Sequence, residues 1–203
     1  MNIKPILIII TSVFLLTSCE QSNEQLMDKA YNLSKQKKFD KAVEAYTDVI
    51  KRNSKLQLAY YNRGLAYLAT KKYEMALADF NKIMALQTQG DFILTYNKDV
   101  PYADEETKAQ VSYNDALYQT AQVKYFMGSL KSSFIDFQIL VDNNYEEKSN
   151  CVLWQGTIYE KSGNTDEACR CFDKAKQFAS TEGDRKEADE MIKTYCGQNT
   201  NNR

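Results

Sequence analysis

The sequence offers few residues that could do catalytic chemistry. It has no histidine, which is the commonest general base of enzymes and the commonest metal ligand. A serine–histidine–aspartate triad, a cysteine–histidine pair and a histidine-containing zinc site are therefore excluded. The sequence also lacks a glycine-rich phosphate loop and a nucleophile elbow. We expect no enzyme activity, no catalytic residue, no bound metal and no cofactor.

Carboxylates occur in adjacent groups, at residues 104–106, 146–147 and 166–167. A glycosidase needs two carboxylates that face each other across a cleft, and the spacing of these groups marks no such pair. Adjacent acidic residues are common at the exposed start of a helix, where they interact favourably with the helix dipole. We interpret the three groups as solvated helix starts.

The first nineteen residues have the features of a secretory signal peptide. Residues 1–4 include a lysine, residues 5–16 are almost wholly apolar, and two small residues precede Cys19. The apolar stretch is shorter than the ~20 residues that a membrane-spanning helix needs. The segment therefore favours export over a permanent transmembrane anchor.

The segment Leu16-Thr17-Ser18-Cys19 closely resembles the lipobox of bacterial lipoproteins. The resemblance implies that a signal peptide, residues 1–18, is removed and that Cys19 is lipidated, with residues 19–22 as a short tether. Two or three acyl chains would anchor the protein stably, because each buried CH₂ contributes about 0.8 kcal/mol. Either the inner or the outer membrane fits this reading. The alternative is an ordinary cleaved signal that contains a cysteine by coincidence.

The composition indicates a folded, largely helical chain. Its 203 residues include only 7 glycines and 2 prolines, which argues against a turn-rich all-β protein. Hydrophobic residues make up 43% and charged residues 26%, as in ordinary folded domains. With 26 basic and 27 acidic residues the net charge is −1, so the basic excess of nucleic-acid-binding proteins is missing. We expect no nucleic-acid partner.

Small and aromatic residues recur with a period of 34 or 35 residues. Four times, a small residue is followed twelve positions later by a second small residue and four positions after that by an aromatic ring. The first small residues are Ala30, Gly64, Ala121 and Gly156, the second are Ala42, Ala76, Ser133 and Ala168, and the rings are Tyr46, Phe80, Phe137 and Phe172. Apolar residues around them follow the i, i+3, i+4, i+7 spacing of amphipathic helices.

This pattern resembles the tetratricopeptide repeat (TPR), a helix-turn-helix of 34 residues. The match is strongest at residues 57–90 and weakest at 114–147, where Lys124 replaces the usual aromatic residue and Ser133 replaces alanine. The proline that usually closes a repeat is absent from all four units. The resemblance implies an all-α, right-handed α-solenoid of about four TPR units with a C-terminal capping helix.

In this frame the chain divides into seven segments. They are the signal peptide (1–18), the lipidated tether (19–22), TPR units 1 and 2 (23–90), an inter-repeat insertion (91–113), TPR units 3 and 4 (114–182), the capping helix (183–196) and a disordered tail (197–203). The insertion contains a short apolar run and a proline, and its residues 103–113 are predicted to form a helix that leads into unit 3. It is either an overlong connection or a functional loop at the groove edge.

Four cysteines remain besides Cys19. The capping helix should run antiparallel to the helix expected over 166–178, which would bring Cys196 near Cys169 and Cys171. A disulfide from Cys196 to either of them would be stable in an exported chain, although free buried thiols that act as small apolar residues are favoured. Cys169 and Cys171 point in different directions on a helix and do not pair easily. Together with Cys151, the spacing matches no zinc site.

The resemblance also implies a concave face built from the first helix of each unit. Its positions, carried over one by one, are filled by Met27, Tyr31, Lys35, Tyr61, Asn62, Leu65, Leu68, Tyr118, Gln122, Tyr125, Phe126, Leu153, Trp154, Thr157 and Lys161. The residues predicted to bind a partner are Tyr31, Tyr61, Asn62, Leu65, Leu68, Tyr118, Gln122, Tyr125, Trp154 and Lys161. Tyrosine and tryptophan are favoured in protein-recognition hot spots. The lysine and asparagine clamp with which some TPR proteins grip a C-terminal carboxylate is not expected, because those positions lack the cations.

These features predict a non-catalytic protein–protein interaction scaffold. We expect an exported TPR lipoprotein, anchored to a bacterial membrane through Cys19, whose groove binds a peptide or helix of another cell-envelope protein. The alternative is an accessory lipoprotein that binds glycan or another small ligand beside an enzyme or transporter, since aromatic residues can stack on sugars. The architecture resembles small repeat lipoproteins that help to assemble outer-membrane proteins or pili, and no motif selects either role.

Overall fold

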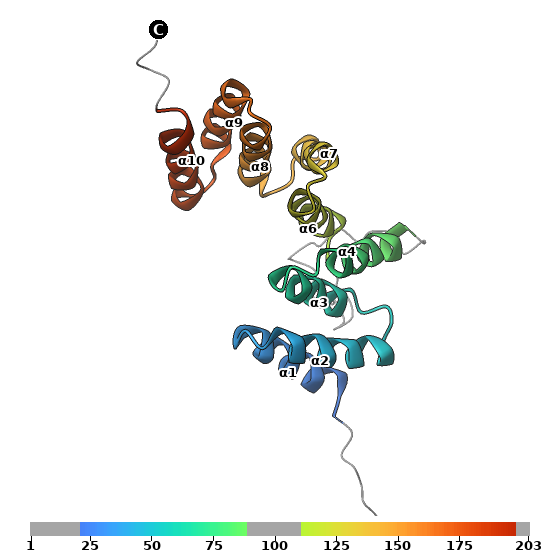
Figure 1. Cartoon of the computed structure of the whole chain (residues 1–203). Coiled ribbons are helices and arrows are strands. Elements are labelled where there is room, and N and C mark those ends of the chain that lie inside the picture. Colours follow the sequence, from blue (N-terminus) through green and yellow to red (C-terminus); the bar gives the residue numbers. More distant parts are fainter. Residues whose placement is uncertain (1–20, 89–110, 198–203) are drawn as a thin grey trace, which may run out of the picture.

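The computed structural model describes residues 21–88 and 111–197, and within these ranges every regular element is an α-helix (Figure 1). The helices are α1 (Asn23–Lys35), α2 (Phe39–Arg52), α3 (Gln57–Ala69), α4 (Tyr73–Thr88), α6 (Tyr113–Phe126), α7 (Leu130–Asp142), α8 (Lys148–Lys161), α9 (Thr165–Phe178) and α10 (Glu182–Tyr195). Each helix packs against the next along the chain, so that the elements form one curved stack from α1 to α10. This is the all-α solenoid that the repeat pattern predicts.

Four helix pairs make up most of the stack, and a tight turn joins the two helices of each pair. One residue in each turn has a positive φ: Lys37 (58°), Lys71 (59°), Gly128 (81°) and Gly163 (78°). Glycine adopts this conformation at little cost, whereas a residue with a Cβ is strained by roughly 1–2 kcal/mol. The same turn is thus built from glycine in the C-terminal pairs and from lysine in the N-terminal pairs.

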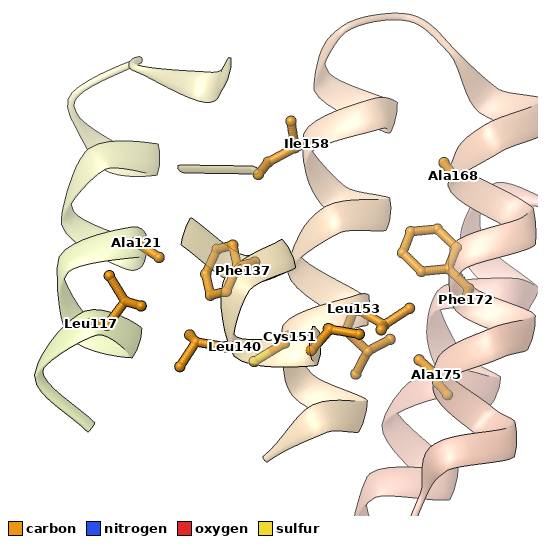
Figure 2. Close-up of a cluster of buried hydrophobic side chains, with 13 residues drawn as sticks. Leu117, Ala121, Phe137, Leu140, Cys151, Leu153, Ile158, Ala168, Phe172 and Ala175 are labelled. Carbon is orange, nitrogen blue, oxygen red and sulfur yellow. The ribbon is translucent and has the colours of Figure 1, made fainter. Parts of the chain in front are cut away.

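The small and aromatic residues of the repeat pattern meet in the core. The four rings are fully buried, and so are the small residues that face them. A Cβ added to Gly64 would lie 2.8 Å from the Phe80 ring, and one added to Gly156 would lie 2.4 Å from the Phe172 ring. In unit 3, Ala121 of α6 faces Phe137 of α7 (Figure 2). The small residues therefore leave the space that the buried rings occupy.

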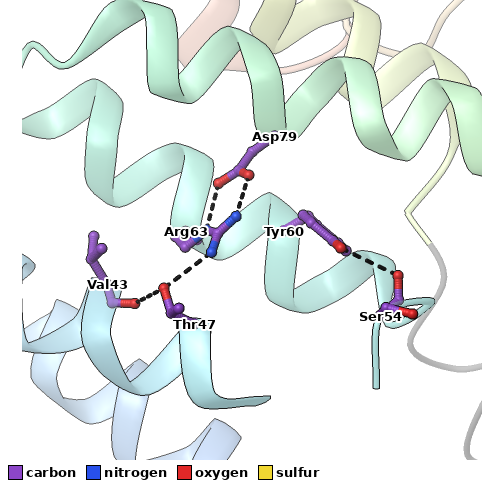
Figure 3. A network of polar contacts seen from close by, with 6 residues as sticks. All are labelled: Val43, Thr47, Ser54, Tyr60, Arg63 and Asp79. Carbon is purple, nitrogen blue, oxygen red and sulfur yellow. Dashed lines mark hydrogen bonds and ion pairs between the residues drawn. The ribbon is translucent and has the colours of Figure 1, made fainter. Parts of the chain in front are cut away.

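A partly buried ion pair and a hydrogen bond from the same arginine link three helices in the N-terminal half (Figure 3). Arg63 of α3 donates two hydrogen bonds to the carboxylate of Asp79 on α4, at 2.9 and 2.7 Å. The same guanidinium donates to Oγ1 of Thr47 on α2 at 3.0 Å. Unit 3 has a similar half-buried pair, in which Nζ of Lys124 lies 2.6 Å from the carboxylate of Asp136. Lys124 therefore replaces the usual aromatic residue at a position where it has a charged partner.

The stack continues across the insertion. Helices α4 and α6, which flank it, pack directly against each other. Val111 is buried, its N–H donates to Oε1 of Gln57 at 3.2 Å, and its carbonyl accepts a hydrogen bond from Gln87. The C-terminal end of the insertion is thus fixed to α3 and α4. Residues 89–110 lie outside the described residues.

The helix predicted over 103–113 is wrong at its C-terminal end. Residues 111 and 112 are not helical, and Ser112 is instead the N-cap of α6. Its Oγ accepts a hydrogen bond from the N–H of Asp115 at 3.0 Å, and the Asp115 carboxylate accepts one from the N–H of Ser112 at 3.3 Å. This capping box sets the start of α6 at Tyr113.

The terminal helix α10 packs its apolar side on α9 and α8. Ala188 is fully buried, while Met191, Ile192 and Tyr195 are half-buried against the C-terminal core. The helix begins at Glu182 rather than at the predicted residue 183, because Thr181 forms a capping box with Asp184. It therefore covers the open end of the stack with a polar outer side.

Candidate partner-binding groove

Helices α6 and α8 present their predicted groove residues along one face. Tyr118, Gln122 and Tyr125 recur on α6 at spacings of four and three residues, and Trp154 and Lys161 lie two turns apart on α8. These spacings place each set on one side of its helix. Contacts between the two sets then join the helices into one surface.

An aromatic cluster forms the centre of this surface. It consists of Tyr118, Tyr125, Phe126, Phe137 and Trp154. Trp154 stacks on Phe137 with ring centroids 5.8 Å apart, and it meets Tyr125 and Phe126 edge-on at 5.1 and 6.0 Å. Each such pair contributes about 0.5–1.5 kcal/mol beyond its buried area. The cluster is therefore a rigid platform, although Phe126 remains 45% exposed.

A hydrogen bond fixes the orientation of the tryptophan. Nε1 of Trp154 donates to the hydroxyl oxygen of Tyr118 at 3.3 Å. Burial raises the pKa of Tyr118 to about 12, so the phenol stays neutral at physiological pH and keeps its proton. The Tyr118 hydroxyl can then donate one hydrogen bond of its own.

A hollow of about 350 Å³ opens beside the aromatic cluster. Helices α6, α8 and α10 line it. The lining residues are Tyr118, Gln122, Asn150, Leu153, Trp154, Thr157, Glu187 and Met191. Aromatic rings, two amides, a hydroxyl and a carboxylate therefore converge on one concave site, as in sites that bind ligands.

Three residues of the hollow were missed by the sequence analysis: Asn150 of α8, and Glu187 and Met191. Glu187 and Met191 belong to α10, which was interpreted as a passive cap. They are four residues apart, so they share one side of the helix. That spacing was the available signal, but the packing angle of α10 decides that this side reaches the hollow.

Lys161 lies at the far end of the same face. Its Nζ is 4.4 Å from the centroid of the Tyr125 ring. This is a cation–π contact, which contributes about 0.5–1 kcal/mol at an exposed site. Lys161 is therefore held beside the aromatic cluster and does not line the hollow.

The predicted groove residues of unit 2 mainly pack within the stack. The hydroxyl of Tyr61 accepts a hydrogen bond from Nε2 of Gln119 at 3.2 Å, and its ring meets Phe80 edge-on at 5.8 Å. Leu65 and Leu68 are half-buried against the N-terminal core. Asn62 is also half-buried. These side chains position α3 against α4 and α6 more than they present a surface.

Tyr31 lies apart from the aromatic cluster. It is 48% exposed on α1, at the opposite end of the stack from α8 (Figure 1). Nζ of Lys35 on the same helix sits 4.7 Å from its ring centroid. Of the predicted set, the structure thus gathers Tyr118, Gln122 and Trp154 around the hollow and Tyr125 and Lys161 beside it.

The cysteines differ from the favoured expectation of free thiols. Cys169 of α9 and Cys196, the C-cap of α10, form a disulfide, because the antiparallel helices bring their Cα atoms to 5.8 Å. Cys151 and Cys171 are free. Burial raises the pKa of Cys151 to about 12, so this thiol is unreactive at physiological pH. Among the described residues no group of three or more potential ligands could hold a metal ion.

Several predictions fall outside the described residues. They are the signal peptide at 1–18, the lipidated Cys19, most of the insertion at 91–110 and residues 198–203 of the tail. In the two described ranges, no helix combines the length and the apolar character needed to cross a membrane.

Comparison with protein families identifies the repeats. Models described as "Tetratricopeptide repeat" match residues 27–90 and residues 151–182. Human neutrophil cytosol factor 2 is 33% identical over 60 residues, a stretch that covers 30% of this chain and 11% of that protein. Residues 27–90 and 151–182 therefore match tetratricopeptide repeats, while the chain spans only about a tenth of the length of the human protein.

Comparison with solved structures supports the same fold. A putative kinesin light chain of Podospora anserina with TPR-like repeats has a TM-score of 0.62 and 13% identity, with 88% of each chain covered. MamA from Desulfovibrio magneticus has a TM-score of 0.60 and 12% identity, covering 89% of this chain and 96% of that one. The first TPR of Spaghetti, solved with an HSP90 peptide, has a TM-score of 0.51 and 19% identity, covering 70% and 95%. At these identities the likeness extends to the fold alone.

Proposed function

We propose that this chain, an all-α solenoid of tetratricopeptide repeats, is a non-catalytic scaffold that holds a segment of a partner protein on its concave face. We further propose that lipidation of Cys19 anchors it to a bacterial membrane in the cell envelope. The observation that carries the first proposal is the hollow beside the aromatic cluster, which α6, α8 and α10 line.

Several features support a protein partner. Aromatic side chains that are partly buried and held by neighbours lose little conformational freedom when a partner binds, and such residues dominate protein interfaces. Trp154 fits this description, because Phe137, Tyr125 and Tyr118 all restrain it. The Spaghetti structure with its HSP90 peptide is an example of the same fold with a bound peptide.

The sequence before α1 supports the anchor. The lipobox-like segment ends at Cys19, and Ser22 is already the N-cap of α1. Three residues span at most about 10 Å when extended. The proposed lipid would therefore hold the first repeat against the membrane surface.

A photo-crosslinking experiment tests the scaffold proposal. A crosslinking amino acid is placed at Gln122, which lines the hollow, and at Lys51, an exposed residue of α2, as the control. We expect one discrete protein adduct at Gln122 in the native host and none of the same identity at Lys51. Identical adducts at both positions, or no protein adduct at Gln122, would contradict the proposal.

A second experiment tests the anchor. We expect Cys19→Ser to abolish incorporation of a labelled fatty acid and to release the chain from washed membranes. The control is Cys171→Ser, which removes a free thiol within the repeats. Unchanged membrane retention of Cys19→Ser would show that the protein is held in some other way.

Glycan binding is the second candidate function. The hollow combines the Trp154 ring with the amides of Asn150 and Gln122, and such groups can stack on and hydrogen-bond to a sugar. Titration with a panel of envelope oligosaccharides, followed by the fluorescence of Trp154, tests this candidate. A saturable response to an oligosaccharide, without a protein adduct at Gln122, would favour it over the scaffold.

A further inference from the structure

The hollow has an uneven charge. Of the described residues that line it, Glu187 of α10 is the one with an acidic side chain, and none is a lysine or an arginine. Glu187 is exposed, so that its carboxylate is hydrated and available at the rim. The other polar groups of the lining are neutral amides and hydroxyls. A ligand group that enters the hollow therefore meets negative charge and no compensating positive charge from the lining.

A second carboxylate lies at the end of the hollow where α8 begins. Glu147 is the N-cap residue of α8, and its Oε2 accepts a hydrogen bond from Nδ2 of Asn150 at 2.5 Å. It is close enough to Tyr118 to contribute to the raised pKa of that phenol. The hollow is thus flanked by acidic groups from two helices, α8 and α10.

The aromatic rings of the hollow are suited to a cation. A lysine or arginine group within about 6 Å of the face of tryptophan or tyrosine is attracted to the ring, and tryptophan is the best of these partners. The cluster already contains one such contact, between Lys161 and Tyr125. Lys161 lies seven residues beyond Trp154 on α8, which corresponds to about 10 Å along the helix. The hollow therefore offers an aromatic and carboxylate environment, and within the part of the chain that the structure describes no lysine or arginine lines it.

From these observations we propose that the hollow binds a lysine or arginine side chain from the bound segment of the partner protein. The rings of Trp154 and Tyr118 contact the alkyl part and the cationic group of this side chain, and the carboxylate of Glu187 supplies the opposite charge. The volume of about 350 Å³ suits one long side chain with its flanking backbone and lies near the lower end of ligand pockets. This inference rests on the proposed scaffold function and names the part of the partner that is recognised.

Trp154 is the only tryptophan of the chain, so its fluorescence reports directly on the hollow. The test uses the full chain in detergent and acetylated, amidated pentapeptides Gly-Leu-X-Leu-Gly, in which X is arginine, lysine, citrulline or norleucine. Citrulline keeps the shape of arginine without its charge, and norleucine keeps an alkyl chain alone. We expect arginine and lysine peptides to bind at least about 5-fold more tightly than the other two.

Charge variants make the test specific. We expect Glu187→Gln to lower the preference for the arginine peptide over the citrulline peptide by about 3-fold. We expect Glu187→Lys to bind a peptide with X as glutamate more tightly than the arginine peptide. The matched control is Glu182→Gln, which removes an exposed carboxylate from the same helix without touching the hollow. The circular dichroism of each variant checks that the fold is retained.

Three results would overturn the inference. The first is equal affinities for the arginine and norleucine peptides. The second is an unchanged preference for arginine over citrulline in Glu187→Gln. The third is a Trp154 fluorescence change that saturates with an oligosaccharide but with no peptide. Failure of the inference is distinguishable from failure of the proposed function. A partner adduct at Gln122 together with an absent charge preference would leave the scaffold standing and remove only the cation site.

Discussion

At the scale of single residues, the space beside Gly156 is too small for a larger side chain at this position. A Cβ there would lie 2.4 Å from the Phe172 ring, which is fully buried. We expect Gly156→Ala to lower the free energy of unfolding by about 1–3 kcal/mol, because Phe172 must shift in a packed core. Urea-induced unfolding measures this change.

Gly183→Ala is the matched control. Gly183 lies inside α10, is exposed, and a Cβ there would meet only Oγ1 of Thr181 at 3.5 Å. This substitution should stabilise the protein by roughly 0.5–1 kcal/mol, since alanine is the better helix former. Equal stabilisation by Gly156→Ala would show that the core yields more easily than the geometry implies.

The buried phenol of Tyr118 makes stability depend on pH in the alkaline range. Its pKa is about 12 in the folded protein and near 10 when unfolded, so between these values the unfolded chain binds fewer protons than the folded one. Stability should therefore be fully present below pH 10 and fall as the pH rises toward 12. Cys151, with a pKa also raised to about 12, acts in the same direction from about pH 9.

Tyr118→Phe isolates this contribution. At pH 7 the variant loses the hydrogen bond from Trp154, which costs about 0.5–1.5 kcal/mol. At pH 11 we expect the deficit to shrink or change sign, because phenylalanine cannot ionise. Urea unfolding of both proteins at the two pH values measures the difference. A deficit that does not change with pH would mean that Tyr118 does not titrate in this way.

Single residues were predictable where the repeat prescribes them. The buried rings and the small residues beside them follow from the 34-residue period alone. The ion pairs Arg63–Asp79 and Lys124–Asp136 could not be predicted in this way, because each joins two helices whose contact depends on their crossing geometry. Glu187 escaped prediction for the same reason. The sequence shows on which side of α10 it lies, but not that this side reaches the hollow.

At the scale of elements, α10 is held at both ends and forms one wall of the hollow. A short connection follows α9, the disulfide joins Cys196 to Cys169, and Nζ of Lys176 lies 2.6 Å from the carboxylate of Asp189. We expect the double variant Cys169→Ser with Cys196→Ser to lose about 3 kcal/mol, since the disulfide spans 27 residues. The weakened helix should also bind the arginine peptide less tightly.

Amide hydrogen exchange locates this effect. Protection should fall in α10 and change little in α1 and α2. Cys171→Ser, in α9 but outside the disulfide, is the control and should leave α10 protected. Unchanged protection of α10 in the double variant would show that helix packing alone holds this wall in place.

The helices themselves were predictable, but their ends were less so. Amphipathic spacing gave the helices, whereas capping residues set the boundaries at Ser112 and Thr181. The turns show the same limit. Gly163 marks its turn in the sequence, but Lys37 and Lys71 occupy the same positive-φ position and give no such signal. Packing of the two helices imposes the turn, whatever residue occupies it.

At the scale of the whole molecule, the two proposed functions lie at opposite ends of the stack. The hollow is lined by α6, α8 and α10. The proposed lipid would precede α1, and α8 and α10 lie toward the other end of the stack (Figure 1). A stack anchored at its first repeat would therefore hold the hollow away from the membrane surface. This arrangement suits a scaffold that receives a segment of a partner beyond the lipid headgroups.

The last prediction concerns the insertion at 91–113. Removing it shows whether the hollow or the insertion recognises the partner. Helices α4 and α6 pack directly, and Val111 is fixed to Gln57 and Gln87, so the stack should close without the intervening chain. We expect replacement of residues 91–108 by a four-residue Gly-Ser linker to leave the melting temperature and the Trp154 emission nearly unchanged. Changes in loop length cost little, about 0.6 kcal/mol per doubling.

Photo-crosslinking of the partner from Gln122 in this variant then shows whether the insertion is an overlong connection or a functional loop. Capture that persists at Gln122 means that the hollow recognises the partner and that the insertion is an overlong connection. Capture that is lost while the melting temperature is retained would instead make the insertion the recognising loop. A variant with Glu187→Gln in the intact chain is the control, since it alters the hollow and leaves the insertion as it is. If the hollow recognises the partner, Glu187→Gln should weaken partner binding and replacement of the insertion should not.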